Sequence, residues 1–132
     1  MATKTPSILA SDVLLAINDK DYGTLDKLTT EDVQLRFPPG QLFTGRQSLE
    51  QFLREVEKRL PRMTLVGHHV HTGDDFAVVE YEVTATTAAN RQHEAMGCLV
   101  LAFAGDRVKQ ATLYVDTAQW QAIGREQGVS AS

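Results

Sequence analysis

The side chains best suited to chemistry lie in the last third of the chain, where Asp116 follows Tyr114 by two residues and Thr112 by four. On a β-strand this spacing puts all three on one face, opposite an apolar set. If the polar face lines a cavity, the Asp116 carboxyl loses water, its pKa rises, and it can act as a general base with Tyr114 as polar partner. The alternative is a strand-end Asp116 that caps the next turn by accepting backbone N–H groups. The apolar set is Ala111, Leu113 and Val115.

A pair of carboxylates, Glu80 and Glu82, forms a second candidate group. They stand two residues apart and therefore leave the same face of a strand. Paired carboxylates in different surroundings can divide into an acid and a base, so we predict that both contact a ligand. The alternative is a solvated outer face on which they pair with a basic side chain such as Arg91 or Lys109.

Three histidines, His68, His69 and His71, fall within four residues. On a regular strand His69 and His71 share a face and His68 points the other way, so at most two of the three converge. Catalytic zinc generally takes three protein ligands, and the chain has no HExxH motif. We therefore predict no metal site, and expect His69 or His71 to serve as a polar group or proton carrier in a pocket.

Hydrophobic periodicity predicts the elements that position these groups: two helices, a strand, a third helix and then four strands. Ser7 and Ser48 are the expected N-caps of the first and third helices. A short turn at Gly105-Asp106 predicts that the last two strands are antiparallel neighbours. The predicted helices span 8–18, 22–28 and 48–60, and the predicted strands 33–37, 63–72, 76–87, 93–104 and 108–116.

Strands that cluster after helices favour an α+β fold over a parallel βαβ sheet. A helix on one face of a long, bent sheet leaves a concavity of the kind that binds small ligands. We predict an apolar small-molecule ligand there, contacted by Phe37, Phe52, Val56 and Trp120. The first three are expected to belong to the core as well, and Trp120 is either a lid, a core residue or a dimer contact.

Length and charge restrict the remaining possibilities. The 132 residues suit a single domain over 1–132. The net charge of −4 without a basic run disfavours nucleic-acid binding. No apolar stretch is long enough to span a membrane. Cys98 is the sole cysteine, which excludes an intrachain disulfide and suits a reducing compartment, so we expect a cytoplasmic protein.

Two segments carry a family resemblance. The run Arg36-Phe37-Pro38-Pro39-Gly40, followed by Phe43-Thr44-Gly45-Arg46 and the helix from Ser48, resembles the nuclear-transport-factor-2-like superfamily, and within it the SnoaL-like and ketosteroid-isomerase-like proteins. The ending Leu113-Tyr114-Val115-Asp116, with Trp120 after it, is similar to the last strand of that family. The resemblance covers about residues 8–124.

This resemblance implies a cone-shaped barrel, with helices on a strongly curved, mixed but mostly antiparallel sheet, and commonly a homodimer. It implies an enzyme of polyketide cyclase or isomerase type that moves protons without a metal or organic cofactor, on an apolar carbonyl-bearing substrate, with Asp116 as base. The alternative is a non-catalytic module that binds a ligand or dimerises. Epoxide hydrolases of this fold use an Arg between two Asp residues, and Glu80-Tyr81-Glu82 lacks that Arg, which disfavours that reaction.

Overall fold

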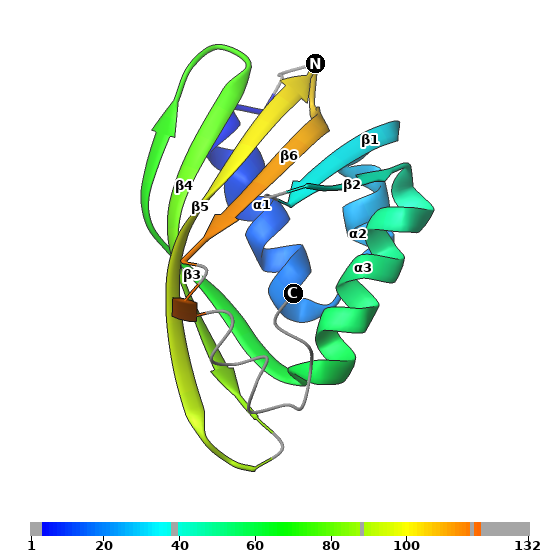
Figure 1. The fold of residues 1–132 in the computed structure, drawn as a ribbon. Coiled ribbons are helices and arrows are strands. Elements are labelled where there is room, and N and C mark those ends of the chain that lie inside the picture. Colours follow the sequence, from blue (N-terminus) through cyan, green and yellow to red (C-terminus); the bar gives the residue numbers. More distant parts are fainter. Residues whose placement is uncertain (1–3, 38–39, 88, 117, 120–132) are drawn as a thin grey trace.

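The computed structural model describes residues 4–37, 40–87, 89–116 and 118–119. Within these ranges the chain forms three helices and six strands, in the predicted order apart from one additional strand (Figure 1). The elements are α1 (Pro6–Asp19), α2 (Tyr22–Lys27), β1 (Thr29–Phe37), β2 (Gln41–Thr44), α3 (Arg46–Arg59), β3 (Arg62–Thr72), β4 (Phe76–Thr86), β5 (Gln92–Ala104) and β6 (Arg107–Val115).

The strands form a single curved sheet in the order β2-β1-β6-β5-β4-β3. The β1–β6 pair is parallel and the other four neighbouring pairs are antiparallel. The sheet bends around the helices but does not close, since β2 and β3 are edge strands (Figure 1). The predicted α+β class and mixed, mostly antiparallel sheet are confirmed. The cone is open along one side, and is not a closed barrel.

At the sheet one local prediction is confirmed, and one strand is present that the sequence did not predict. β5 and β6 pair antiparallel through the turn at Gly105, whose φ is 60°, and glycine tolerates that left-handed backbone. The additional strand, β2, pairs with the end of β1, where Phe37 lies opposite Gln41. The sequence pattern missed it because four residues are too few to show an alternation.

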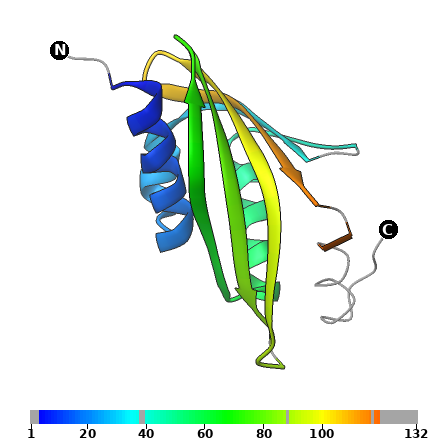
Figure 2. The same ribbon diagram turned by 90° about the vertical axis from the view of Figure 1, so that its left-hand side faces the viewer.

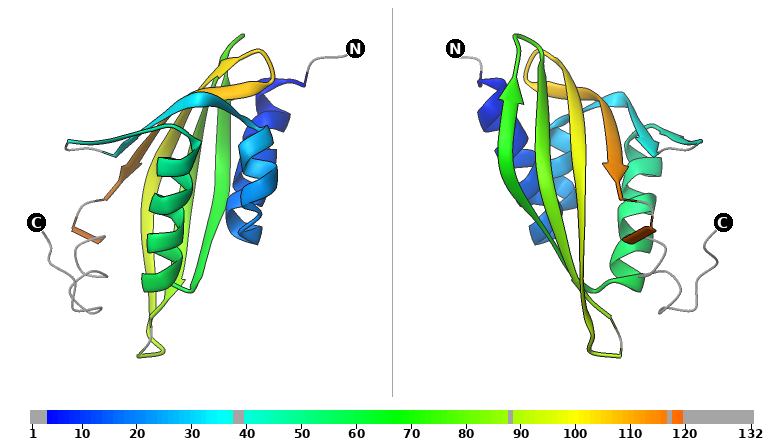
Figure 3. Two further views of the ribbon diagram at one scale, coloured as in Figure 1. Left: turned by 90° about the vertical axis from the view of Figure 1, so that its right-hand side faces the viewer. Right: turned by 60° about the vertical axis from the view of Figure 1, so that its left-hand side comes forward.

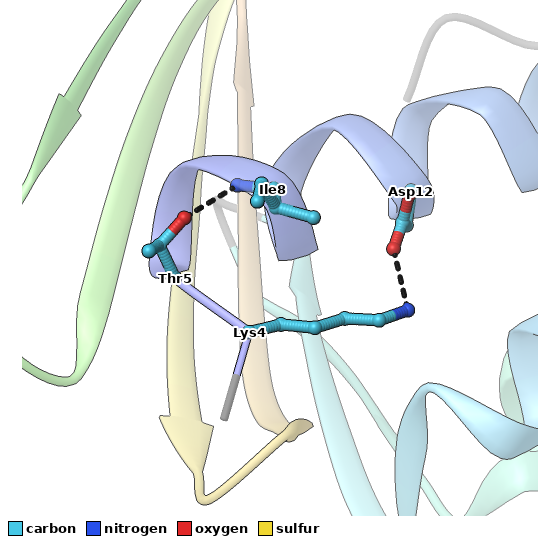
Figure 4. Close-up of polar contacts among 4 residues, drawn as sticks. All are labelled: Lys4, Thr5, Ile8 and Asp12. Atoms are coloured by element: carbon cyan, nitrogen blue, oxygen red, sulfur yellow. Dashed lines mark hydrogen bonds and ion pairs between the residues drawn. The ribbon is translucent and has the colours of Figure 1, made fainter. Parts of the chain in front are cut away.

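The first turn of α1 begins earlier than predicted, and Thr5 is its cap in place of Ser7 (Figure 4). Thr5 Oγ1 accepts a hydrogen bond from the Ile8 N–H at 3.3 Å, and Pro6 occupies the first turn, where its missing N–H costs nothing. Lys4 Nζ pairs with Asp12 Oδ2 at 2.9 Å along the same helix. The Ser48 prediction is also wrong, because α3 starts two residues earlier after Gly45, whose φ of 93° suits glycine.

The apolar core lies between α1 and the inner face of the sheet. α1 packs on β3 and β4 (Figure 1). At its end, the Asn18 side chain both donates to and accepts from the backbone of Leu65, at 2.9 and 2.8 Å, and so pairs part of the β3 edge. No helix in the described ranges is long and apolar enough to cross a membrane. The buried core residues of α1 are Leu9, Ala10, Val13 and Ala16.

Candidate functional site

A cavity lies between α3 and the inner face of the sheet. Its volume is about 90 Å³, taken as the space open to the centre of a water molecule. All three helices and every strand except β2 contribute to its wall. The lining residues are Val13, Ile17, Leu25, Thr29, Val33, Gln34, Leu35, Phe37, Leu49, Phe52, Leu53, Val56, Met63, Leu65, Tyr81, Val83, Leu99, Leu101, Val108, Ala111, Leu113 and Val115.

Among the described residues none that lines the cavity carries a charge, and the polar ones are Thr29, Gln34 and Tyr81. The hydroxyl of Thr29 donates to the Leu25 carbonyl at 3.1 Å. The hydroxyl of Tyr81 donates to the Tyr114 carbonyl at 2.7 Å. Both hydroxyls are thus satisfied by the protein itself, and the wall presents hydrocarbon to whatever enters.

Tyr81 is the one titratable side chain among the described wall residues, and only 2% of it is exposed. Burial raises the pKa of its phenol well above the ordinary 10, with a smaller contribution from Cys98. The group therefore stays protonated at any working pH and cannot serve as a base. The Tyr81 side chain has space only because residue 97 on the neighbouring strand is glycine: an added Cβ there would lie 2.5 Å from the Tyr81 hydroxyl oxygen.

Helix α3 is the open wall of the cavity. The helix is amphipathic, yet none of its residues is buried. Its apolar side chains line the cavity, so they are not fully covered by other side chains. At one end of the cavity Phe52 contacts two aromatic rings of the β1–β2 hairpin, Phe37 at 5.7 Å and Phe43 at 5.0 Å between centroids. Phe37, Phe52 and Val56 therefore lie where the sequence predicted a pocket wall, and contact with a ligand stays a prediction.

The polar face of β6 points away from the cavity. Leu113 and Val115 line the cavity, while Tyr114 is 47% exposed and Asp116 is exposed. Asp116 Oδ1 accepts a hydrogen bond from the Gln119 N–H at 3.0 Å, which matches the alternative of a cap. The orientation on which the general-base role of Asp116 and the partner role of Tyr114 depended is therefore wrong.

The two glutamates also lie outside the cavity. Each pairs with a histidine on β3: Glu80 Oε2 lies 2.8 Å from His71 Nε2, and Glu82 Oε2 lies 3.1 Å from His68 Nε2. The hydrogen bond to His71 lowers the pKa of Glu80 below its ordinary 4.5. The prediction that the two glutamates line a ligand pocket is wrong, and the solvated-face alternative holds, with histidine partners in place of arginine or lysine.

The directions in which the three histidine side chains point follow from an irregularity in β3. Gly67 pairs with Tyr81 and His69 with Glu80, so His68 is an extra residue in the ladder, a β-bulge. The bulge lets His68 reach Glu82 on the same outer face as His69 and His71, so the prediction that His68 points the other way is wrong. His69 and His71 are exposed there and do not line the cavity.

Two further predictions concern Trp120 and metal binding. Trp120 lies outside the described residues. In the described part of the chain no three His, Cys, Asp or Glu side chains converge as metal ligands. The wall residue that sequence reasoning left without a role is Tyr81, although its place in the apolar alternation of β4 indicated the inner face.

Comparison with known proteins supports the fold. A family model described as the SnoaL-like domain matches residues 11–111. Among curated proteins none matches the sequence. Many solved structures are similar, and three of them are compared below.

IdmH from Streptomyces antibioticus, a candidate polyketide cyclase, is 17% identical over 91% of this chain and 98% of its own, with a TM-score of 0.82. TerC, co-crystallised with polyporic acid, is 16% identical over 90% and 98%, with a TM-score of 0.82. A nuclear-transport-factor-2-like protein of unknown function from Burkholderia pseudomallei is 17% identical over 91% and 97%, with a TM-score of 0.83. At these identities the likeness shows the shared fold alone.

Proposed function

Because this chain belongs to the SnoaL-like domain family, we propose that its cavity binds an apolar small molecule. The observation that carries this proposal is the wall itself, in which the described part of the chain places no charged side chain and two hydroxyls that are already paired within the protein. Transfer of apolar surface from water to such a wall contributes roughly 25 cal/mol per Å². A charged ligand would lose its hydration there without a partner.

The size of the cavity supports the same class of ligand. One water molecule needs roughly 10–15 Å³ of such a cavity, so about 90 Å³ accommodates several waters or a small organic molecule in their place. Few polar groups are available to hold those waters, so an apolar ligand that replaces them gains free energy. The relative TerC, co-crystallised with polyporic acid, supports an organic ligand.

Fluorescence titration with N-phenyl-1-naphthylamine, a neutral apolar dye, tests the proposal. We expect saturable binding to the wild-type protein and a loss of at least tenfold in affinity for Leu113→Trp, which fills the cavity from β6. Thr84→Trp is the matched control, since Thr84 lies on the outer face of β4, one position from Val83 of the wall. Equal affinity for all three proteins, or no binding, would reject the cavity as the binding site.

A second candidate function is cyclisation or isomerisation of an apolar carbonyl-bearing compound without a cofactor, which the likeness to the candidate cyclase IdmH favours. General acid–base catalysis needs a proton-transfer group within reach of the substrate, and the described wall has no carboxylate or imidazole. The enzyme we propose would therefore act by confinement: it would hold an enol carbon of a flexible chain against a distant carbonyl carbon. The C–C bond would form as the carbonyl π bond breaks, and the enol O–H proton would pass through water to the new hydroxyl oxygen. Turnover of a linear poly-β-ketone by the wild type but not by Leu113→Trp is the expected result, and no turnover by either rejects it.

We also propose that the outer face of the sheet forms a homodimer interface. In the described ranges no helix covers this face of β3, β4 and β5 (Figure 2). Large apolar side chains are exposed on it: Val66 by 44%, Phe76 by 42%, Met96 by 50% and Tyr114 by 47%. Val66 and Met96 flank Glu82 in one cross-strand row, and Tyr114 and Cys98 continue the row of Glu80. Such a face suits a self-complementary two-fold contact.

Sedimentation velocity at low micromolar concentration tests the dimer. We expect twice the chain mass of 14.6 kDa for the wild type and the mass of one chain for Met96→Glu. The control is Leu15→Glu, since Leu15 is 60% exposed on α1 and should leave the dimer intact. A wild-type species of one chain mass only would sink this proposal.

A further inference from the structure

The cavity wall passes from α2 to α3 at what we call the seam, and both helices lie on the same side of the sheet (Figure 3). Ile17 and Leu25 line the cavity on one side of this seam, and Leu53 and Val56 line it from α3 on the other. At the seam the described cavity wall is made of helix side chains, and strands supply the opposite wall.

A polar cluster joins the two helices on the solvent side of the seam. The Tyr22 hydroxyl of α2 donates to Glu57 Oε2 of α3 at 2.5 Å. The Arg54 guanidinium lies over the Tyr22 ring at 4.4 Å from its centroid. Lys20 Nζ lies 3.8 Å from the other Glu57 oxygen and donates to the Pro61 carbonyl at 2.8 Å. Three of these contacts, those of the Tyr22 hydroxyl, the Arg54 guanidinium and Lys20 Nζ, involve Tyr22 or Glu57.

The Tyr22–Glu57 hydrogen bond persists over the working pH range. Burial and the neighbouring Glu57 carboxylate raise the pKa of Tyr22 to about 12, so the phenol remains a donor. A hydrogen bond to a charged acceptor is shorter and stronger than one between neutral groups. By contrast, the Lys20–Glu57 pair is exposed and long, and contributes little.

The other contacts of α3 are to β1, to β2 and to the apolar core: Arg46 donates to the Thr29 carbonyl, Phe52 contacts Phe37 and Phe43, and Leu49 and Leu53 pack on the core. None of the residues of α3 is buried, and its main packing partners are β1 and β2, which precede it directly. Its C-terminal end is followed by Leu60, which is 4% exposed and packs in a small cluster of its own with Ala85. Between these two ends the middle of the helix faces the cavity, and the contact from Tyr22 is its polar link across the seam.

We propose that Tyr22 and Glu57 form a latch across the seam between α2 and α3, and that an apolar ligand enters the cavity when this latch opens. The latch rests on the proposed binding function, but its two residues do not touch the ligand: they are positioning residues for the α3 wall. Opening the seam moves Leu53 and Val56 away from Ile17 and Leu25 and exposes the cavity to solvent. The ligand then crosses the same barrier on entry and on exit. Loss of the latch therefore changes both rate constants and leaves the equilibrium affinity of the cavity nearly unaffected.

Four variants test the latch. Tyr22→Phe removes the hydroxyl and keeps the ring under Arg54, and Glu57→Ala removes the acceptor. Glu57→Gln keeps an acceptor oxygen and should restore wild-type behaviour in large part. Glu55→Gln is the control on α3, since Glu55 is exposed and pairs only weakly with Lys58 at 3.7 Å.

Stopped-flow mixing with N-phenyl-1-naphthylamine supplies the first measurement. We expect Tyr22→Phe and Glu57→Ala to raise both the association and the dissociation rate constants about fivefold to tenfold, with the dissociation constant changed less than threefold. The double variant should match either single one, because both remove the same contact. A merely structural role for Tyr22 would lower the melting temperature and leave both rate constants at wild-type values, which overturns the latch.

Hydrogen exchange without ligand supplies the second measurement and separates the latch from the binding proposal. Faster exchange confined to the amides of α3 in Tyr22→Phe and Glu57→Ala, and not in Glu55→Gln, supports a helix that opens across the seam. Unchanged exchange in α3 rejects the latch even if the dye binds. Failure of the wild type to bind the dye, with faster exchange in α3, rejects the binding proposal and leaves the latch standing.

Discussion

The inner and outer faces of the sheet differ in chemistry although the same strands supply both. On β4, Val79, Tyr81 and Val83 face inward and are at most 2% exposed, while Glu80 and Glu82 face outward to histidines of β3. The inner face is apolar and lines the cavity, whereas the outer face holds the titratable groups. The groups best suited to proton transfer and the space best suited to a ligand are thus on opposite sides of one sheet.

This separation shows what the two faces contribute to function. The inner face lines the cavity in which we propose that an apolar molecule binds, and its described residues offer no base, because Tyr81, the one titratable group among them, stays protonated. The outer face offers paired charges in water, where each is worth little as a catalyst or as a stabilising contact. Ligand binding on one side and protein contact on the other therefore follow from the same alternation of residues.

The largest effect of a substitution on stability is expected at Gly97, which pairs with the inner-face residues Tyr81 and Val115. A Cβ at this position would lie 2.1 Å from the Tyr114 carbonyl oxygen and 2.6 Å from Cζ of Tyr81, and the backbone atom cannot move aside. We expect Gly97→Ala to lower the free energy of unfolding by about 3 kcal/mol or more, measured by urea denaturation. Gly40→Ala is the control, since nothing lies within 4 Å of its Cβ position; an equal effect of the two would contradict the close inner-face packing.

The two tyrosines provide the next comparison. Tyr81→Phe removes the hydroxyl that donates to the Tyr114 carbonyl at 2.7 Å, and we expect a loss of about 1 kcal/mol in the free energy of unfolding. Tyr114→Phe changes an exposed side chain on the outer face, and we expect less than about 0.5 kcal/mol. Thermal and urea unfolding of both variants measure the difference. A larger loss for Tyr114→Phe would reverse the assignment of the two faces.

Much of the fold could be predicted from the sequence. The helix and strand order is correct apart from β2, and the boundaries are within two residues except at β1, which starts four residues before the predicted Val33. Periodicity over ten or more residues is a strong signal. The caps were missed by two and by three residues, since Thr5 and Gly45 each precede a serine that also suits the role. Two neighbouring residues can suit the cap position equally well, and the packing of the whole helix decides which of them is the cap.

The candidate site was harder to predict, for a physical reason. Alternation divides β6 into Leu113 and Val115 on one side and Tyr114 and Asp116 on the other, but it does not say which side faces the cavity. The catalytic interpretation required polar groups inside, and hydrophobic burial placed the apolar set there. The bulge at His68 has no signature in the pattern either, because it depends on the pairing of β3 with β4.

A smaller effect is expected from the His71–Glu80 pair on the outer face. The hydrogen bond from His71 lowers the pKa of Glu80 in the folded protein below its ordinary 4.5, so the ionised carboxylate favours folding above pH 4.5, and this contribution is lost as the pH falls through the lowered value. We expect carbon-13 NMR to give Glu80 a midpoint below 4.5 in the wild type and a value near 4.5 in His71→Asn. High salt should weaken the shift, because the pair is exposed. An unshifted wild-type midpoint would contradict the pairing.

The smallest effect is expected at Asp116, and it bears most directly on the comparison of the faces. Asp116 lies on the outer side of β6 and accepts the Gln119 N–H, a role that asparagine fills equally well. We therefore expect Asp116→Asn to keep its fold and to bind N-phenyl-1-naphthylamine within twofold of the wild type. Because a catalytic base must reach the substrate, a cavity substrate that the wild type turns over should also be turned over by this variant. A fall in turnover by orders of magnitude with the fold intact would show that the polar face of β6 reaches the substrate, and would return the general-base role to Asp116.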